Sequence, residues 1–284
     1  MKILYENSEL PQQVSLILGF FDGIHAGHRD VFKNTADAPR VVVTFSYSPI
    51  EYFKKDFKYI YSREYNYRLI EDLGIDYIFE QDFSNIVNIS ANDYLKTLIE
   101  KFSPVSITTG FNHTFGYNKV GNVNLLKENQ GTYKYFCTPA TKFGDDIVSS
   151  TLIKKMISKG ELEIANKFLA KNFTIESTVI EGQKLGRELG FPTANMIYPD
   201  NIIKLPYGVY KARIFNRPAV MNWGIKPTIG GGETLEVHIP NYDIDLYGKK
   251  VQVELISKLR DEKKFVNIEE LKSQIEKDVV ECLK

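Results

Sequence analysis

Cysteine, surplus charge and long apolar runs are all scarce in this sequence of 284 residues. Its two cysteines, Cys137 and Cys282, lie far apart and form no metal or redox motif, so a reduced, cytoplasmic setting is expected. Thirty-six basic residues balance thirty-six acidic ones, which argues against nucleic acid as a main partner. No apolar run approaches membrane length and no signal-peptide core opens the sequence, so no membrane partner is expected.

Histidine is also scarce, yet two of the four histidines lie in one short stretch, residues 14–28. The stretch begins with an apolar run that ends at glycine, which predicts a buried strand. Gly23 and Gly27 permit a sharp turn and a close approach to a ligand. If a helix begins between His25 and His28, the two rings lie side by side where N–H groups and the helix dipole favour a phosphate. The alternative is a tight strand-to-helix turn with incidental histidines.

In the first half of the chain, short apolar segments alternate with helical ones. Strands are predicted at residues 14–18, 40–45, 75–79, 105–109 and 133–138, with one helix ending at Gly74 and another running from Ser90 to Phe102. This alternation predicts a doubly wound, Rossmann-like parallel sheet with helices on both faces. Ligands of such folds bind beyond the carboxyl ends of the strands, which is where the histidine turn would lie.

The pattern changes after two helical segments that span residues 149–170 and are separated at Gly160. Apolar and polar residues then alternate in several short segments without intervening helices, which predicts an antiparallel β-barrel. The last segment, 267–283, has helical spacing and Asn267 as its N-cap. We therefore expect one domain at 1–157, a helical join at 158–171 and a second domain at 172–284.

A second glycine-rich stretch lies at residues 182–195, with three glycines in nine residues. The N–H groups of such a loop can bind phosphate, together with Arg187. Thr193 and Asn195 offer a hydroxyl and an amide oxygen, which suit Mg²⁺. From spacing alone, an ordinary glycine-rich turn explains this stretch better than a nucleotide site does.

Two motifs together resemble one enzyme family. Residues 19–28 are similar to the G-x-F-D-G-x-H-x-G-H signature of the H-x-G-H nucleotidyltransferases, and G-R-E-L-G-F-P-T-A-N at 186–195 resembles the nucleotide site of riboflavin kinases. The chain is identified as a member of the bacterial bifunctional riboflavin kinase/FAD synthetases over nearly its whole length. The resemblance implies phosphorylation of riboflavin to FMN by ATP with Mg²⁺, and adenylylation of FMN to FAD with release of pyrophosphate.

The resemblance also implies roles for single residues. Glu236 falls at the position of the kinase general base, and His25 and His28 fall where the family holds ATP phosphates during adenylyl transfer. Matches at 221–230, 245–248 and 259–265 extend the kinase resemblance. The other implied nucleotide, flavin or metal contacts are Gly19, Phe20, Asp22, Gly23, Asn112, Ser150, Thr151, Lys154, Gly182, Gly186, Arg187, Thr193, Asn195 and Arg260, with Thr193 and Asn195 as the Mg²⁺ ligands.

Four positions depart from the family pattern. Ser46 and Ser48 stand where an aspartate and a histidine are common, His113 replaces an aromatic residue, and Lys154 replaces an arginine. Lysine keeps the charge but loses the two-pronged contact with phosphate. Two alternative functions follow: a riboflavin kinase whose adenylyltransferase half is weak or selects one redox state of the flavin, and a non-catalytic flavin-binding regulator. Retention of Glu236 and of both motif histidines argues against the regulator.

Overall fold

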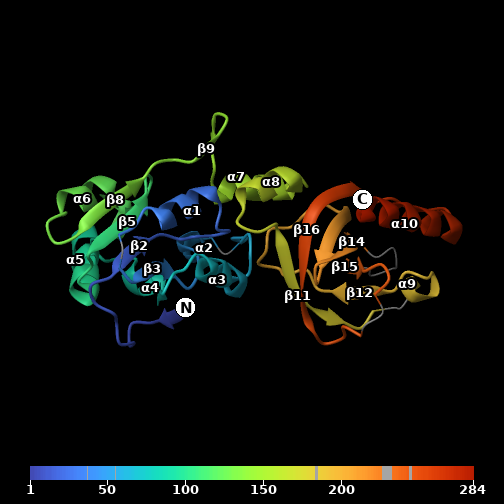
Figure 1. The fold of residues 1–284 in the computed structure, drawn as a ribbon, viewed down its shortest axis with the longest axis horizontal. Coiled ribbons are helices and arrows are strands. Elements are labelled where there is room, and N and C mark those ends of the chain that lie inside the picture. Colours follow the sequence, from blue (N-terminus) through green and yellow to red (C-terminus); the bar gives the residue numbers. More distant parts are fainter. Residues whose placement is uncertain (37, 55, 183–184, 226–231, 243–244) are drawn as a thin grey trace. The chain divides into compact units, whose positions relative to one another are not determined.

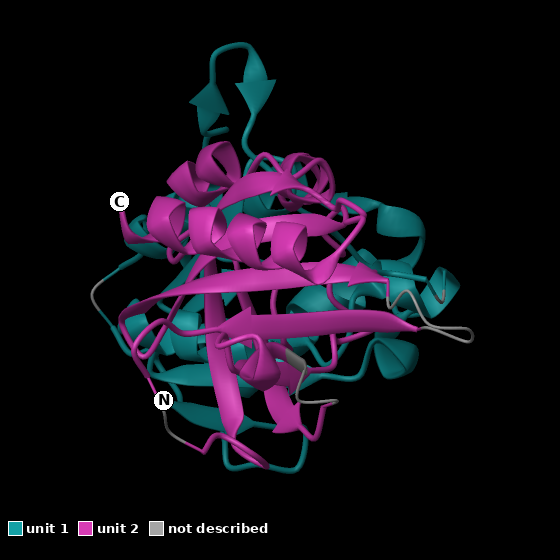
Figure 2. Cartoon of the chain, turned by 90° about the vertical axis from the view of Figure 1, so that its right-hand side faces the viewer, with its two compact units in different colours: residues 1–57, 63–149 teal, residues 58–62, 150–284 magenta. Residues whose placement is uncertain are grey.

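A computed structural model of the protein describes residues 1–36, 38–54, 56–182, 185–225, 232–242 and 245–284. The chain divides into two compact units, coloured separately in Figure 2. Unit 1 contains residues 1–57 and 63–149, and unit 2 contains residues 58–62 and 150–284. Residues 158–171, predicted as a helical join, therefore group with unit 2, and so do residues 150–157, which were predicted to belong to the first domain, and the short segment 58–62.

Unit 1 is built on the predicted parallel sheet, which has six strands in the order β1-β4-β3-β2-β5-β8 (Figure 1). The strand predictions are correct to within two residues, and the edge strand β1 was not predicted. In chain order the strands are β1 (Lys2–Leu4), β2 (Ser15–Leu18), β3 (Arg40–Phe45), β4 (Tyr77–Gln81), β5 (Ser106–Gly110) and β8 (Lys134–Thr138).

Helices and two small hairpins complete unit 1. The helices are α1 (Ala26–Lys33), α2 (Pro49–Phe53), α3 (Arg63–Asp72), α4 (Phe83–Ile86), α5 (Ala91–Phe102), α6 (Val123–Glu128) and a 3₁₀ turn, η1 (Tyr117–Lys119). The hairpins pair β6 (Thr114–Phe115) with β7 (Gly121–Asn122) and β9 (Lys142–Phe143) with β10 (Asp146–Ile147). Helix α5 begins as predicted, because the Ser90 hydroxyl accepts a bond from the Asp93 N–H at 3.1 Å.

The strand alternation sends two sets of side chains to the two faces of this sheet. Leu16 and Val43 pack in one buried cluster with Leu95 and Phe102 of α5. On the opposite face, the Thr108 hydroxyl donates to the Asn34 carbonyl at the end of α1, at 3.0 Å. Both faces are covered by helices, as doubly wound sheets require.

Unit 2 is a closed antiparallel barrel with the strand order β11-β12-β15-β14-β13-β16, as predicted. Its strands are β11 (Thr174–Ile180), β12 (Thr193–Met196), β13 (Gly208–Ile214), β14 (Arg217–Ile225), β15 (Glu233–His238) and β16 (Lys250–Asp261). Trp223, 1% exposed, is the largest side chain of its core and donates to the Leu205 carbonyl at 3.1 Å.

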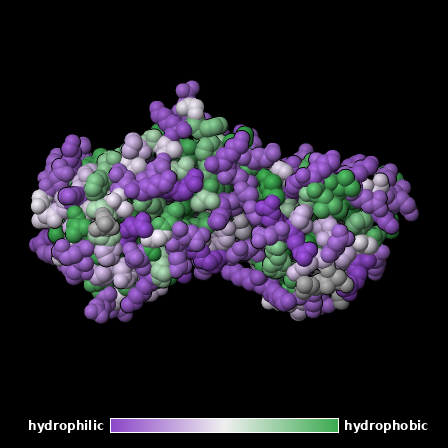
Figure 3. All heavy atoms as spheres, in the orientation of Figure 1, coloured by the Kyte–Doolittle hydropathy of each residue, from purple (hydrophilic) through white to green (hydrophobic). Residues whose placement is uncertain are grey.

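The helices of unit 2 are α7 (Ser150–Ser158), α8 (Leu162–Phe168), α9 (Leu185–Glu188) and α10 (Ile268–Leu283). The predicted N-cap of α10 is present, since Asn267 Oδ1 accepts from the Glu270 N–H at 2.8 Å. The apolar residues at helical spacing in α10 are only half-buried or exposed, and the buried residues of this helix are Asp278 and Cys282. Apolar residues remain exposed where α10 ends, as Figure 3 shows. None of the helices in the described ranges is long and apolar enough to cross a membrane.

Candidate active sites

The histidine motif forms the turn from β2 into α1 in unit 1. His25 caps the helix with its own ring, since its Nδ1 accepts a bond from the His28 N–H at 3.3 Å. The two rings stack with centroids 3.6 Å apart, so the predicted side-by-side arrangement is correct. A Cβ on Gly27 would lie 3.3 Å from the His25 ring. The glycine therefore lets the helix approach the ring closely.

Burial keeps both imidazoles neutral. It lowers the pKa of His25 to about 4, with a contribution from the positive charge of Arg29. Burial, and then the neighbouring His25, hold the pKa of His28 well below its usual value. Because Nδ1 of His25 is an acceptor, the neutral ring carries its proton on Nε2. The site therefore offers a neutral N–H donor and a helix N-terminus.

Asn66 of α3 binds the same turn from the other side. Its Nδ2 donates to the Phe21 carbonyl at 2.5 Å, and its Oδ1 accepts from the Gly23 N–H at 3.0 Å. The amide of Gly23, which the sequence assigns to ligand binding, is thus already bonded to protein. The motif gives no signal for Asn66, because the residue lies on a different element.

This turn lies at the topological switch point of the sheet. Strand β2 has β3 on one side and β5 on the other, and the connections run in opposite directions from it. The crevice beyond the carboxyl ends of such strands is where ligands of open parallel sheets bind. The loop after β5 contains Asn112 and His113, so these two residues border the same crevice.

A cavity of about 400 Å³ opens beside the ends of β2 and β3. Gly19 and Phe20 line it, as does His113 from the loop after β5. Aromatic rings from separate segments form much of its wall: Phe83 of α4 lies 5.4 Å from Phe45 and 6.1 Å from Phe53, centroid to centroid. No motif in the sequence indicates these phenylalanines, because they come from separate segments.

His113 stacks on Phe115, with ring centroids 5.7 Å apart, and lines this wall. Burial lowers the pKa of His113 to about 4, so this ring is neutral as well. Its Nε2 is buried and has no hydrogen-bond partner among the residues that the structure describes. Asn112 is exposed, and a Cβ on Gly110 would lie 3.6 Å from its Oδ1.

The two serine departures are accommodated locally. Ser48 is buried and caps α2, because its hydroxyl accepts from the Ile50 N–H at 3.2 Å. The Ser46 N–H donates to the Gln81 carbonyl at 3.0 Å. Asp22 is 5% exposed within the histidine turn. Ser150, Thr151 and Lys154 lie in α7, which belongs to unit 2, whereas the histidine turn belongs to unit 1.

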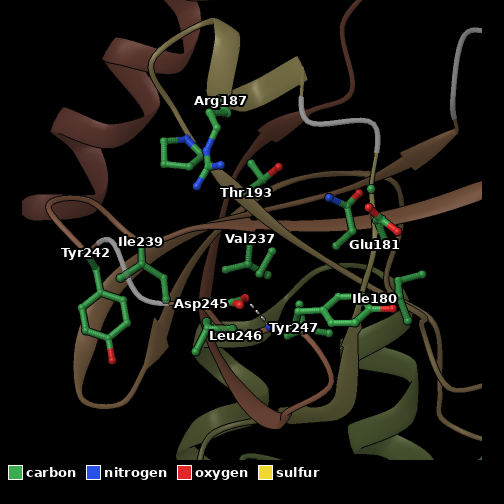
Figure 4. A pocket seen from close by; sticks show the side chains of 15 residues that line it. Ile180, Glu181, Arg187, Thr193, Val237, Ile239, Tyr242, Asp245, Leu246 and Tyr247 are labelled. Carbon is green, nitrogen blue, oxygen red and sulfur yellow. Dashed lines mark hydrogen bonds between the residues drawn. The ribbon is translucent and has the colours of Figure 1, made fainter.

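Unit 2 has a cavity of about 570 Å³ that the glycine-rich stretch borders (Figure 4). Gly182, Arg187, Thr193 and Asn195 line it, and Asp245 lines it from the segment 245–248. In Figure 4 the side chains of Arg187 and Thr193 both lie at the cavity. Residues 183, 184 and 226–231 lie outside the described residues, so parts of two predicted segments are not placed.

Close packing explains two of the glycines in this stretch. A Cβ on Gly182 would lie 2.1 Å from Nδ2 of Asn195, and a Cβ on Gly186 would lie 2.5 Å from the Phe191 carbonyl oxygen. The Phe191 N–H donates to the Gly186 carbonyl at 2.7 Å. The loop is therefore folded tightly around the predicted metal ligands.

Glu236 lies next to those predicted ligands, on the neighbouring strand β15 of the barrel. Asn195 on β12 pairs in register with Glu236 on β15, and the Thr193 hydroxyl lies 3.4 Å from Oε2 of Glu236. The Thr234 hydroxyl lies 3.2 Å from its Oε1. Glu236 is half-buried, while Leu235 and Val237 are buried on the other face of the strand. The Thr193 hydroxyl and the Glu236 carboxylate thus lie together, with Asn195 at the paired position of the neighbouring strand.

Arg260 makes a contact that the sequence did not predict. Its guanidinium binds the buried Asp278 of α10, with Nη2 to Oδ2 at 2.8 Å, and Gln274 donates to the same carboxylate at 2.9 Å. In this arrangement Arg260 ties β16 to α10. Among the described residues, no group of three or more His, Cys, Asp and Glu side chains is placed to bind a metal.

Comparisons with known proteins agree with both halves of the chain. The family model described as riboflavin kinase matches residues 169–284, and the model described as FAD synthetase matches residues 7–152. Bifunctional riboflavin kinase/FMN adenylyltransferases from Buchnera aphidicola and Escherichia coli are 31% and 30% identical, over 99% and 97% of this chain and 96% and 94% of theirs. The Bacillus subtilis enzyme of that name is 30% identical over 95% of this chain and 91% of its own.

A solved structure from Streptococcus pneumoniae, named as a macrolide-efflux protein, has a TM-score of 0.89 and 28% identity to this chain. It covers 98% of this chain and 97% of its own. With a parallel sheet next to the H-x-G-H turn, a barrel around the G-F-P-T-A-N segment, and relatives that match from end to end, the chain belongs to the bifunctional riboflavin kinase/FMN adenylyltransferases, which make FMN from riboflavin and FAD from FMN.

Proposed function

We propose that the two activities are divided between the two units, with FMN adenylylation in unit 1 and riboflavin phosphorylation in unit 2. One observation carries the division: each unit has its own cavity beside the motif for one reaction. The stacked histidines adjoin the end of β2 next to the aromatic cavity, and Thr193, Asn195 and Glu236 meet beside the larger cavity.

In unit 2, Glu236 takes the proton from the ribityl hydroxyl as that oxygen attacks the γ-phosphorus of ATP. The new bond is oxygen to γ-phosphorus, and the bond to the β-phosphate oxygen breaks, leaving ADP. Arg187 and the N–H groups of the 182–195 loop would bind the phosphates, since such transfer depends mainly on positioning and charge. The Thr193 hydroxyl, 3.4 Å from Glu236 Oε2, would help to orient this carboxylate.

The donor set in unit 2 fits Mg²⁺. Thr193 and Asn195 supply neutral oxygens beside a carboxylate, and Mg²⁺ prefers oxygen ligands and keeps several waters. When bound, the ion would neutralise phosphate charge. Thr193 and Asn195 would hold the ion. Gly182 leaves room for the Asn195 side chain, because any Cβ at position 182 would clash with it.

In unit 1, an FMN phosphate oxygen attacks the α-phosphorus of ATP, and the α–β bridging bond breaks to release pyrophosphate. Because burial keeps His25 neutral, its Nε2–H stabilises the developing charge as a dipole rather than as a cation. Arg29 supplies fixed positive charge beside it. The flavin ring would lie in the aromatic cavity, whose wall includes Phe53, 68% exposed and open to stacking.

A cytoplasmic location suits this assignment, because the chain uses ATP and both of its cysteines are free thiols. The family resemblance implies nucleotide or flavin contacts for five further residues, each of which can be tested by substitution: Asn112, Ser150, Thr151, Lys154 and Arg260.

The test is incubation of the pure protein with riboflavin, ATP and Mg²⁺, followed by separation of the flavins. We expect FMN and then FAD. Alanine at His25 or His28 should lower FAD formation about a hundredfold, the scale for loss of one charge-stabilising donor, with little effect on FMN formation. Glu236→Gln should lower FMN formation by about 10²–10⁴-fold while supplied FMN is still adenylylated. Equal loss of both activities in any of these variants would contradict the division.

A further inference from the structure

We propose that Asn66 is a positioning residue for adenylyl transfer, which fixes the turn that presents His25 and His28. The proposal rests on the function assigned to unit 1 above. Asn66 stands forty-one positions after His25 in the sequence and outside the H-x-G-H motif, so only the fold brings it to the turn. No role for it follows from the motif.

The geometry is that of a clamp on the backbone. One side-chain amide bonds two backbone groups, the Phe21 carbonyl at 2.5 Å and the Gly23 N–H at 3.0 Å, and so spans the residues just before the helix. Both polar atoms of the amide are used, and this requires the planar Asn geometry. A shift of Asn66 would therefore displace both ends of this short segment.

The clamped segment is also strained. Gly23 has φ +90°, and the next residue, Ile24, has φ +35°, a left-handed conformation that β-branched residues rarely adopt. Such conformations persist only where the surrounding structure holds them in place. The Ile24 side chain is fully buried, and the two bonds from Asn66 hold the backbone. His25 follows directly, so the position of its ring depends on this segment.

The helix that carries Asn66 is itself anchored. One residue further along α3, the Tyr67 hydroxyl donates to Glu80 Oε2 at 2.5 Å, and Arg63 binds Oε1 of the same carboxylate at 3.4 Å. Glu80 lies in β4 and is 8% exposed. Leu69 and Ile70 of α3 are buried in the core. The clamp therefore connects the histidine turn to a rigid part of the sheet, which is what precise placement of a catalytic group requires.

The first experiment measures FAD formation from FMN and ATP in the full-length Asn66→Ala variant. Because misplacement of a catalytic group by about 1 Å can cost on the order of 10²-fold, we expect kcat to fall about 10- to 100-fold. The KM values for FMN and ATP should change less than about threefold, which also shows that unit 1 is folded. Asn124→Ala, at an exposed asparagine of α6, is the matched control and should behave as wild type.

The second experiment repeats Asn66→Ala in a chain that already lacks both histidine rings, His25→Ala with His28→Ala, with radiolabelled ATP to follow slow turnover. If Asn66 acts through the histidines, Asn66→Ala should lower the rate of FAD formation less than about twofold in the chain without the two histidine rings, because the effects of coupled residues are not additive. The same fold loss in both backgrounds would overturn the proposal, since that result describes general destabilisation.

Should Asn66→Ala unfold unit 1, Tyr67→Phe decides, because it removes only the hydroxyl that anchors α3 to Glu80. A lower kcat with unchanged KM would support the clamp, and wild-type kcat would overturn it. A wild-type chain that forms no FAD at all would overturn the assigned function, whereas a wild type that forms FAD alongside a fully active Asn66→Ala would overturn this proposal alone.

Discussion

Residues that titrate near neutral pH in water do not do so in unit 1. His25 and His28 lie at the start of α1 and His113 lies in the loop after β5, and burial is the first cause of the lowered pKa in each case. A buried imidazole without a carboxylate partner is held neutral, because the charged form loses its hydration. The same burial that sets the chemistry of the site therefore also makes the stability of unit 1 depend on pH.

We predict that unit 1 loses stability as the pH falls from about 6.5 toward 4. In this window the unfolded histidines bind protons and the folded ones do not, so the free energy of unfolding decreases on acidification. Each histidine contributes a slope of up to about 1.4 kcal/mol per pH unit. Urea unfolding between pH 7 and pH 5.5, above the range of most carboxylates, measures this slope. His113→Phe should reduce this slope by the contribution of one histidine. An unchanged slope would contradict the prediction.

The His113 position also bears on the choice of flavin. An aromatic ring stacked on a flavin contributes about 0.5–1.5 kcal/mol beyond its buried area, which is up to about tenfold in affinity. We predict that the wild type adenylylates oxidised FMN less efficiently than it phosphorylates riboflavin. We further predict a preference for reduced FMN, whose bent, differently protonated ring suits a wall in which His113 is more polar than an aromatic hydrocarbon ring.

The measurement is FAD formation from oxidised and from chemically reduced FMN, in wild type and in His113→Phe. The variant should gain activity with oxidised FMN and lose the preference. Efficient use of oxidised FMN by the wild type, unchanged in His113→Phe, would show that the departure is neutral.

At the scale of elements, the aromatic cavity depends on how tightly the loop after β5 packs on α5. Gly116 has φ +71°, and a Cβ there would lie 2.5 Å from the Cα of Ala91, the first residue of α5. Gly116 also lines the cavity. The glycine thus serves both the backbone conformation and the close approach of two elements.

Gly116→Ala should therefore destabilise unit 1 more than a positive φ alone would. Gly144→Ala is the matched control, because Gly144 has φ +58° and a Cβ there would meet nothing within 4 Å. We expect a loss of about 1–2 kcal/mol for the control and a further loss of about 1–3 kcal/mol for Gly116→Ala from overpacking. Urea unfolding of both variants checks the difference, and equal losses would show that α5 moves aside at no cost.

At the scale of the whole molecule, the division into units does not follow the sequence strictly. Residues 58–62 group with the barrel. Tyr61 is 1% exposed and donates to the Lys171 carbonyl at 2.6 Å, and the Ser62 hydroxyl donates to Glu176 Oε2 at 2.7 Å. Phe168 of α8 is buried as well, and α8 packs on β16. The barrel therefore includes packing partners from before residue 172.

We predict that a fragment of residues 172–284 forms FMN from riboflavin and forms no FAD. A fragment of residues 150–284 should do the same and unfold at a higher temperature, because it keeps the buried side chains of α7 and α8. Both should be less stable than unit 2 in the full chain, which also has Tyr61. Thermal unfolding and separation of the flavins test this. A fragment that folds cooperatively but has no kinase activity would show that the domain assignment is wrong.

Local patterns in the sequence were sufficient for the elements and for the two motifs. The alternation of strands and helices, the cap at Ser90 and the stacked His25 and His28 all follow from interactions between residues a few positions apart. Such interactions are encoded in periodicity, in glycine positions and in capping side chains. The same local character explains why the strand limits were correct to within two residues.

Only the tertiary structure decided which distant residues support these motifs. Asn66 binds the histidine turn, Tyr61 packs in the barrel unit, and Arg260 binds Asp278. Each contact joins residues that are far apart in the sequence, and no periodic pattern connects them. The aromatic wall at Phe45, Phe53 and Phe83 and the lowered pKa values arise in the same way. Burial and long-range hydrogen bonds depend on where the chain returns in space, and the spacing of residues along the sequence contains no measure of that return.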